Sequence, residues 1–201
     1  MDQNQAHYPT IRETEIPAKF YSFDSGAPFV HCVECDLDLL HTFTPYFVEK
    51  AYRRYRGYEA KDVIYEFAMC MQCAENMRNE LSPESRERMM EYLMTKMDTF
   101  QRSEALKEYD PVADSDRWLS ECILTHEPIE KQEEYVIYGM FKGDKMLVAD
   151  FPYAIGASAM DEITGLLSAK TLGEIDDFMG KHFTGPPEVN ELIGPRRPVF
   201  F

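Results

Sequence analysis

The amino-acid sequence predicts an α+β fold built from two tandem units of similar design. Short segments rich in β-branched and aromatic residues alternate with segments whose apolar residues follow a helical period. In addition, two parts of the chain align when one is shifted by 86 residues. Each unit is therefore expected to contain a knuckle (a tight turn at a cysteine-bearing segment), a β-hairpin and two helices.

The chain contains five cysteines, and four of them form two Cys-x-x-Cys pairs, Cys32 with Cys35 and Cys70 with Cys73. Four thiolates are the ligand set of a tetrahedral structural Zn²⁺ site, with Zn–S distances of about 2.3 Å. Two residues between the ligands of a pair allow a tight turn to direct both sulfurs at one ion. The odd number of cysteines counts against a disulfide framework. The sequence therefore predicts one structural zinc ion per chain, bound by these four cysteines.

The segment between the two pairs, residues 36–69, is longer than the roughly 15–20 residues of a short zinc-ribbon loop. An ordered element must therefore fold within it. Residues 46–48 and 63–69 are predicted as the two strands of a hairpin, because both are rich in aromatic and β-branched residues. The second strand leads directly into Cys70, and residues 74–81 are predicted as a short helix.

This order of knuckle, hairpin and ligand pair at the start of a helix, over residues 28–81, resembles the treble-clef zinc fingers. The resemblance covers about a quarter of the chain and names no particular family within that group. It implies that Cys32, Cys35, Cys70 and Cys73 ligate zinc. The glycine that often follows a knuckle cysteine is replaced by Asp36, which leaves the ligand set intact.

Other interpretations of the four cysteines stay open. They could be small buried hydrophobic residues or a redox dithiol, or they could bind iron in a rubredoxin-like site, which uses the same four sulfurs. The long insert and the missing flanking Gly and Pro favour zinc over iron. A thioredoxin-like role requires one Cys-x-x-Cys pair after a strand of a βαβ unit, so two pairs do not fit it.

A second unit is predicted in the C-terminal half of the chain, where segment 154–168 aligns with 68–82. Residues 135–138 and 146–148 are predicted as its hairpin strands, joined through a turn at Gly143. In both units the last helix has apolar residues at i, i+3, i+4 and i+8. These are Met89, Tyr92, Leu93 and Met97 in the first unit and Ile175, Phe178, Met179 and Phe183 in the second.

Sequence signals also predict where these last helices begin. Ser82 followed by Pro83 is a favourable N-cap and first helical residue. In the second unit, Thr171 and Glu174 have the spacing of a capping box.

The second unit is predicted to lack a metal. Gly156 and Ala159 align with the second cysteine pair of the first unit, and Cys122 falls at the position of Cys35. One thiol cannot hold zinc tetrahedrally, so Cys122 is expected to be a buried residue. This degenerate copy must therefore be held together by apolar packing. Residues suited to that role are Tyr135, Ile137, Tyr138, Met140, Phe141, Met146, Leu147, Phe151 and Tyr153.

The predicted organisation has five parts. They are an N-terminal extension (1–27), a zinc-binding treble-clef-like unit with a helical extension (28–106), a linker (107–117), the degenerate second copy (118–185) and a C-terminal tail (186–201).

The charge balance restricts the classes of partner. The chain has 21 Lys and Arg against 36 Asp and Glu, a formal net charge of −15. Nucleic acids and anionic membrane surfaces bind positively charged surfaces, so neither is the expected partner. No apolar run approaches the roughly 18 residues of a transmembrane helix. The polar N-terminal segment lacks the pattern of a secretory leader, so a cytoplasmic location is expected.

The leading functional prediction is a non-enzymatic, zinc-stabilised cytoplasmic protein that acts through protein–protein contacts. No Gly-rich phosphate loop, nucleophile elbow or other catalytic motif is present in the sequence. The identity of the partner and the oligomeric state stay open.

Two alternatives come from other functional classes. One is a metal-dependent nuclease or nucleic-acid-binding protein that uses the basic and aromatic segment 50–58. His31 and His41 would then be the candidate general bases. The other is an acidic inhibitor or immunity-type protein, which its charge would steer to a basic partner.

Overall fold

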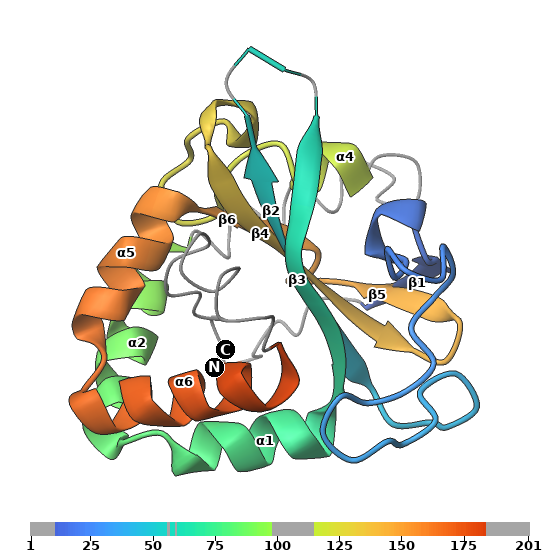
Figure 1. Ribbon diagram of the computed structural model, residues 1–201, viewed down its shortest axis with the longest axis horizontal. Helices are drawn as coiled ribbons and strands as arrows, with labels where there is room; N and C mark the ends of the chain where they lie inside the picture. The colour runs from blue at the N-terminus through green and yellow to red at the C-terminus, as the bar shows by residue number, and fades with distance from the viewer. Residues whose placement is uncertain (1–10, 56, 59, 98–114, 184–201) are drawn as a thin grey trace, which may run out of the picture.

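One twisted antiparallel sheet forms the centre of this computed structural model, which describes residues 11–97, apart from 56 and 59, and 115–183 (Figure 1). Among these residues the sheet has six strands in the order β1-β5-β4-β2-β3, and β6 also pairs with β4. The four longer helices of this part of the chain pack along one side of the sheet (Figure 1). The predicted α+β class is confirmed.

The first hairpin consists of β2 (Tyr46–Arg54) and β3 (Lys61–Cys70), which pair in antiparallel register from Tyr46 opposite Cys70 onward. The hairpin was predicted, but β2 is longer than residues 46–48 and takes in most of the basic segment. A strand tolerates these charges here because acidic side chains on the neighbouring strands pair with them. Lys50 pairs with Glu66 on β3 at 2.8 Å, and Arg53 pairs with Glu134 on β4 at 2.5 Å.

The chain passes from β3 into α1 (Met71–Glu80) without a loop, so Cys70 is both the last residue of a strand and the N-cap of a helix. Helix α2 (Pro83–Lys96) follows. The Ser82 hydroxyl accepts a hydrogen bond from the backbone N–H of Ser85, and Pro83 is the first helical residue. The predicted start of this helix is confirmed.

The second hairpin is β4 (Glu134–Lys142) and β5 (Lys145–Val148), joined by a two-residue turn. Gly143 in this turn has a φ of 56°, a conformation that favours glycine. Strand β6 (Tyr153–Gly156) then pairs with the first half of β4, on the same edge that β5 occupies further along. The hairpin was predicted, whereas β6 was not recognised as a separate strand.

Helices α5 (Ala157–Leu166) and α6 (Ala169–His182) complete the second half. The predicted capping box at Thr171 and Glu174 is wrong, because α6 begins at Ala169 and its N-cap is Ser168. The Ser168 hydroxyl accepts from the backbone N–H of Thr171. The Thr171 hydroxyl is occupied elsewhere, since it accepts from the backbone N–H of Ser82 at 3.0 Å.

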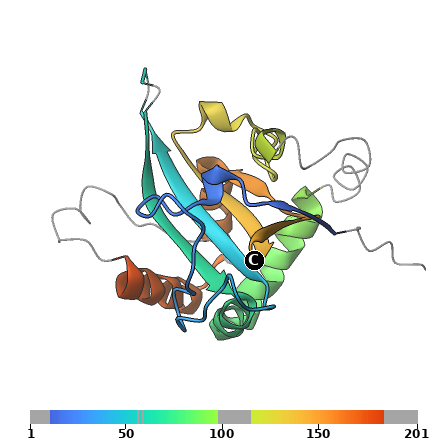
Figure 2. The ribbon, with the colours of Figure 1, turned by 90° about the vertical axis from the view of Figure 1, so that its right-hand side faces the viewer.

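The N-terminal segment covers the side of the sheet opposite to α5 and α6, as Figures 1 and 2 show. Strand β1 (Arg12–Glu15) pairs with β5, and the short 3-10 helix η1 (Ala18–Phe20) follows it. Phe20 is fully buried and packs edge-on against Phe141. Part of the predicted N-terminal extension therefore contributes an edge strand and core residues.

The two predicted units share one sheet and one hydrophobic core, because β2 pairs with β4 along eight residue pairs. The helical turn α4 (Ser115–Trp118) and the 3-10 helix η2 (Ile129–Lys131) precede β4. The division into five parts stays a prediction. Most of the predicted linker and the whole C-terminal tail lie outside the described residues.

Candidate metal centre

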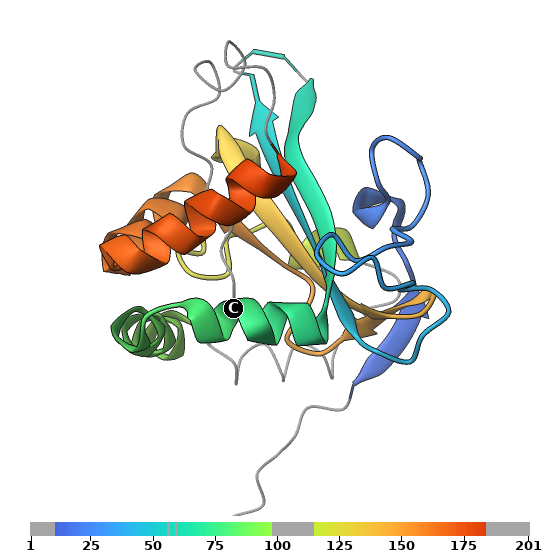
Figure 3. The ribbon, with the colours of Figure 1, turned by 60° about the horizontal axis from the view of Figure 1, so that its bottom comes forward.

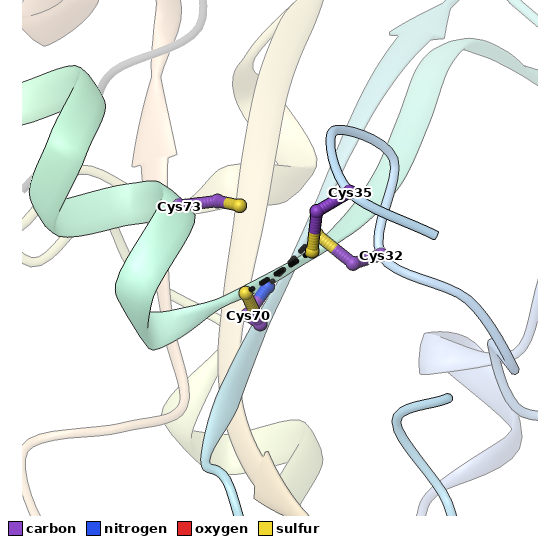
Figure 4. A group of neighbouring side chains, drawn as sticks. All are labelled: Cys32, Cys35, Cys70 and Cys73. Carbon is purple, nitrogen blue, oxygen red and sulfur yellow. Dashed lines mark hydrogen bonds between the residues drawn. The ribbon is translucent and has the colours of Figure 1, made fainter. Parts of the chain in front are cut away.

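The structure brings all four predicted ligand residues together where the loop 31–38 meets the junction of β3 and α1 (Figure 4). Their sulfur atoms all lie within 4.8 Å of one another. Cys32 and Cys70 are buried, Cys73 is half-buried and Cys35 is exposed. Residues far apart in the sequence therefore present four sulfurs to one point at the edge of the core.

The first pair lies in a tight loop closed by backbone hydrogen bonds. The N–H of Cys32 donates to the carbonyl of Leu37, and the N–H of Asp36 donates to the carbonyl of Cys32, both at 3.0 Å. Asp36 has a φ of 58°, in the left-handed region where glycine is favoured and aspartate is among the best-tolerated substitutes. This tolerance explains how the knuckle forms without the usual glycine.

The second pair is positioned by the strand-to-helix junction. Cys70 ends β3 and Cys73 lies in the first turn of α1. The backbone N–H of Cys70 donates to the Cys32 sulfur at 3.4 Å, and the N–H of Val33 donates to the carbonyl of Ala68 at 2.9 Å. These two bonds fix the loop against the strand. The N-terminal end of α1 also favours negative charge at its first residues.

The distance between one sulfur of each pair fits a tetrahedral metal ion. The sulfurs of Cys35 and Cys70 are 3.8 Å apart. Four sulfurs at about 2.3 Å from a tetrahedral Zn²⁺ are separated from each other by about 3.8 Å. A disulfide would require about 2.05 Å, and all five cysteines, which lie within the described residues, are free. The donor set and its spacing therefore suit a thiolate-bound metal.

The surroundings of the cluster shift the pKa of three of its four thiols. Burial raises the pKa of the Cys73 thiol, and the neighbouring thiols raise it further. Burial likewise raises the pKa of Cys70. Burial opposes ionisation of Cys32 as well, but backbone N–H groups of Cys70, Cys35 and Glu34 outweigh it and bring its pKa below the ordinary value. A bound divalent cation would stabilise all four thiolates together.

Two residues at the end of α6 form ion pairs with the knuckle loop. The carboxylate of Glu34, between the two cysteines of the first pair, lies 2.6 Å from Lys181 Nζ and 2.7 Å from His182 Nε2. Burial raises the pKa of Glu34, but these two partners lower it more, so its carboxylate stays charged. Figure 3 shows α6 and α1 running side by side at this end of the sheet. No local pattern in the sequence indicates these three residues, because the positions that pair lie about 150 residues apart.

A cavity of about 350 Å³ lies beside the cluster, between the knuckle, α1 and α6. Acidic side chains dominate its polar lining, which comprises Glu34, Asn76, Glu80, Glu174, Asp177 and Lys181. Four thiolates around one Zn²⁺ would add a net charge of −2. This surrounding disfavours a phosphate or another anion.

The two histidines considered as general bases, His31 at the start of the knuckle loop and His41 just after it, lie outside the sulfur cluster. The ring of His31 is 3.4 Å from the carboxylate of Asp36, and the ring of His41 is 2.9 Å from the carboxylate of Asp38. Each histidine therefore pairs with a carboxylate a few residues away on the exposed loop. Neither lines the cavity beside the cluster.

The described part of the basic segment begins at Lys50, midway along β2, and runs toward the end of the hairpin away from the cysteines, at the top of Figure 1. Lys50 is paired with Glu66, four residues before Cys70, which is about 13 Å at about 3.3 Å per residue, whereas Arg54 is paired with Lys61, about 30 Å from Cys70. Lys50 is buried against Glu66. The Tyr55 hydroxyl donates to the carboxylate of Asp62 at 2.7 Å.

Cys122 lies in a second loop, and its position differs from the predicted one. The N–H of Cys122 donates to the carbonyl of Glu127, and the N–H of His126 donates to the carbonyl of Cys122, both at 2.8 Å. These are the bonds that Cys32 makes in the first loop. The alignment of Cys122 with Cys35 is therefore wrong, since Cys122 occupies the position of Cys32. It is fully buried, as predicted.

None of the helices described combines the length and apolar character that crossing a membrane requires. Comparison of the chain with family models, curated proteins and solved structures gave no match, so its own geometry carries the functional argument.

Proposed function

We propose that this chain is a non-enzymatic protein that one structural Zn²⁺ stabilises and that acts through contacts with another protein. The metal assignment is supported above all by the four cysteine sulfurs, which lie within 4.8 Å of one another. Free thiols of this kind suit a reducing compartment, so we propose a cytoplasmic location.

A structural role follows from the closed ligand set. A catalytic zinc usually has three protein ligands and keeps one position open for water or substrate. Four cysteines fill a tetrahedral shell and leave no such position. The carboxylates around the adjacent cavity would repel an anionic substrate. The metal is therefore proposed to stabilise the fold, since the binding energy of a structural zinc is also folding energy.

We also propose the two-unit organisation, with a treble-clef-like first unit and a degenerate second one. Helices α5 and α6 begin and end 86 residues after α1 and α2. The helix starts also contact each other reciprocally. The N–H of Ser82 donates to the Thr171 hydroxyl at 3.0 Å, and the N–H of Ser168 donates to the Ser85 hydroxyl at 2.8 Å. With β2 paired to β4 in the middle of the sheet, these contacts support an approximate two-fold relation between the units.

The experiment that tests the proposed metal role is chelation of the purified protein under reducing conditions. Removal of zinc should lower the thermal midpoint and loosen the first unit, and added Zn²⁺ should restore both. A chain that keeps its thermal midpoint after complete removal of the metal would contradict the structural role.

The net charge of −15 supports a second candidate, an acidic inhibitor or immunity-type protein. Such a protein would associate with a basic partner through long-range attraction, which salt screens. Pull-downs at low and moderate salt distinguish the candidates. A partner lost at moderate salt favours the inhibitor, and a partner retained there favours the leading proposal.

A further inference from the structure

The second loop repeats the backbone hydrogen bonds of the metal-binding knuckle one for one. In the first unit, Val33 N–H donates to Ala68 at 2.9 Å, and in the second, Ile123 N–H donates to Ala154 at 2.9 Å. Asp36 and His126, 90 residues apart, share a φ of 58°. The other matching donors are Cys32, Asp36 and Leu39 in the first loop and Cys122, His126 and Ile129 in the second.

This correspondence places four residues of the second unit at the positions of the four metal ligands. With a spacing of 90 residues in the loop, Cys122 corresponds to Cys32, and Thr125 corresponds to Cys35. With a spacing of 86 residues at the strand-to-helix junction, Gly156 and Ala159 correspond to Cys70 and Cys73. Gly156 is the N-cap of α5, as Cys70 is of α1.

The space of the missing ligands has been partly filled. A Cβ atom at Gly156 would lie 2.8 Å from the side chain of Gln132, so Gln132 occupies the place of a Cys70-like side chain. Ala159 is fully buried. The hydroxyl of Thr125, the residue that corresponds to Cys35, is buried and has no hydrogen-bond partner among the residues described.

A hydrogen-bonded group joins the loop to the helix where the first unit would use metal. The carboxylate of Glu127, on the loop, accepts from Gln132 Nε2 at 2.9 Å and from the Ser158 hydroxyl at 3.3 Å. Ser158 lies in the first turn of α5. Glu127, Gln132 and Ser158, here called the clamp, therefore connect the same two elements that the cysteine pairs connect in the first unit.

We propose that the second unit is a dormant metal site, in which the clamp replaces a thiolate-bound divalent cation and which returns to metal binding when its thiols are restored. This inference rests on the two-unit organisation proposed above. The cation class is that of the first site, because the restored donors would be four sulfurs in the same backbone frame.

The test is the metal stoichiometry of a variant with Thr125→Cys, Gly156→Cys and Ala159→Cys, together with Gln132→Ala to clear the space. The matched control carries Ser at the same three positions with Gln132→Ala. Added Zn²⁺ is the probe, and Co²⁺ reports thiolate ligation through its charge-transfer absorption. The expected result is one more metal ion per chain in the Cys variant than in both the control and the unmodified protein.

A folded Cys variant that binds no additional metal overturns the proposal. A variant that stays unfolded in excess Zn²⁺ also overturns it, because a restored site would add its binding energy to folding. The unmodified protein measured in parallel separates this outcome from failure of the first site. Extra metal in the Cys variant supports the dormant site even where the unmodified chain binds none.

Hydrogen exchange tests the clamp in the native sequence. Combining Glu127→Ala with Ser158→Ala should speed exchange of the Ile123 amide severalfold and leave the equivalent Val33 amide unchanged. Unchanged exchange at Ile123 would contradict the role assigned to the clamp.

Discussion

Cys73 supplies one of the four clustered sulfurs from the first turn of α1, and three sulfurs cannot close the shell without it. We expect Cys73→Ser to lose the zinc and to unfold the first unit substantially, because metal binding and folding are coupled there. Metal analysis and denaturant unfolding under reducing conditions measure both effects. The matched control is Cys122→Ser, at the position that Cys32 holds in the other loop.

Cys122→Ser should keep the full zinc content. It should cost about 1–3 kcal/mol of unfolding free energy, because it places a hydroxyl in a fully buried site. Loss of zinc from this variant would show that the ligand assignment is wrong.

Lys50 is a charged residue in the core, with 4% of its side chain exposed, and it pairs with Glu66 at 2.8 Å. Removing one partner of a buried ion pair typically costs about 3–5 kcal/mol, because the other charge is left uncompensated. We therefore expect Lys50→Met to lower the free energy of unfolding by about this amount. The exposed pair of Lys145 and Glu15 provides the comparison, and Lys145→Met should have little effect. Equal losses in the two variants would contradict this account of Lys50.

For individual residues, the sequence predicts the metal ligands but not the side chains that contact the ligand loop. Paired cysteines at fixed spacing are a local pattern, so all four could be named in advance. Glu34 also has a local position, between two ligands, but its partners Lys181 and His182 come from α6 and are set by packing alone. The clamp residues carry no motif for the same reason.

At the scale of elements, the starts of α2 and α6 stabilise each other. The hydroxyls of Ser82 and Ser168 are 2.9 Å apart, and each also caps its own helix. Losing an N-cap costs typically about 1 kcal/mol. Because the two caps share a hydrogen bond, we expect Ser82→Ala and Ser168→Ala together to cost less than the sum of the single changes. Strictly additive losses in a double-mutant cycle would contradict this coupling. Thr95→Ala, on the exposed face of α2, should be additive with either.

Two basic side chains of segment 50–58 are already paired with carboxylates of the protein. Lys50 pairs with Glu66 and Arg53 with Glu134. We therefore expect no salt-sensitive binding of single-stranded or duplex nucleic acid, and no cleavage with Mg²⁺ or Mn²⁺. Anisotropy titrations at low and moderate salt check the first point, and incubation with plasmid checks the second. Cleavage that disappears on changing His31 or His41 would favour the nuclease alternative.

Element positions followed from local signals where those signals were strong. The hairpin strands, α1 and the start of α2 agree with the sequence pattern. The start of α6 was misplaced, because Ser168 and Thr171 both offer capping side chains and the choice between them depends on Ser82 from another helix. Strand β6 is four residues long, too short for its periodicity to stand out.

At the scale of the whole molecule, the two predicted units do not form separate bodies but one continuous sheet. The pairing of β2 with β4 creates this sheet and buries Val48, Ala51, Val136 and Ile137 in a common core. Sequence patterns predict strands but not which strand edges meet. That the two units share one sheet could therefore not be predicted from the sequence.

Removal of the metal from the first half of the chain should also affect the second half. Because α6 of the second half contacts the knuckle through Lys181 and His182, loss of metal should also disturb the end of α6. The first effects of chelation in amide spectra should therefore appear in the knuckle, the start of α1 and the last turn of α6. Changes confined to the second loop would contradict this coupling.

Metal analysis combined with X-ray absorption, on protein purified under reducing conditions, tests whether four cysteines hold a structural zinc. We expect one zinc per chain, with four sulfur neighbours at about 2.3 Å and no oxygen or nitrogen neighbour. One iron per chain in the same sulfur environment would keep the site and change the metal. Protein that carries neither tightly bound zinc nor iron would contradict the claim.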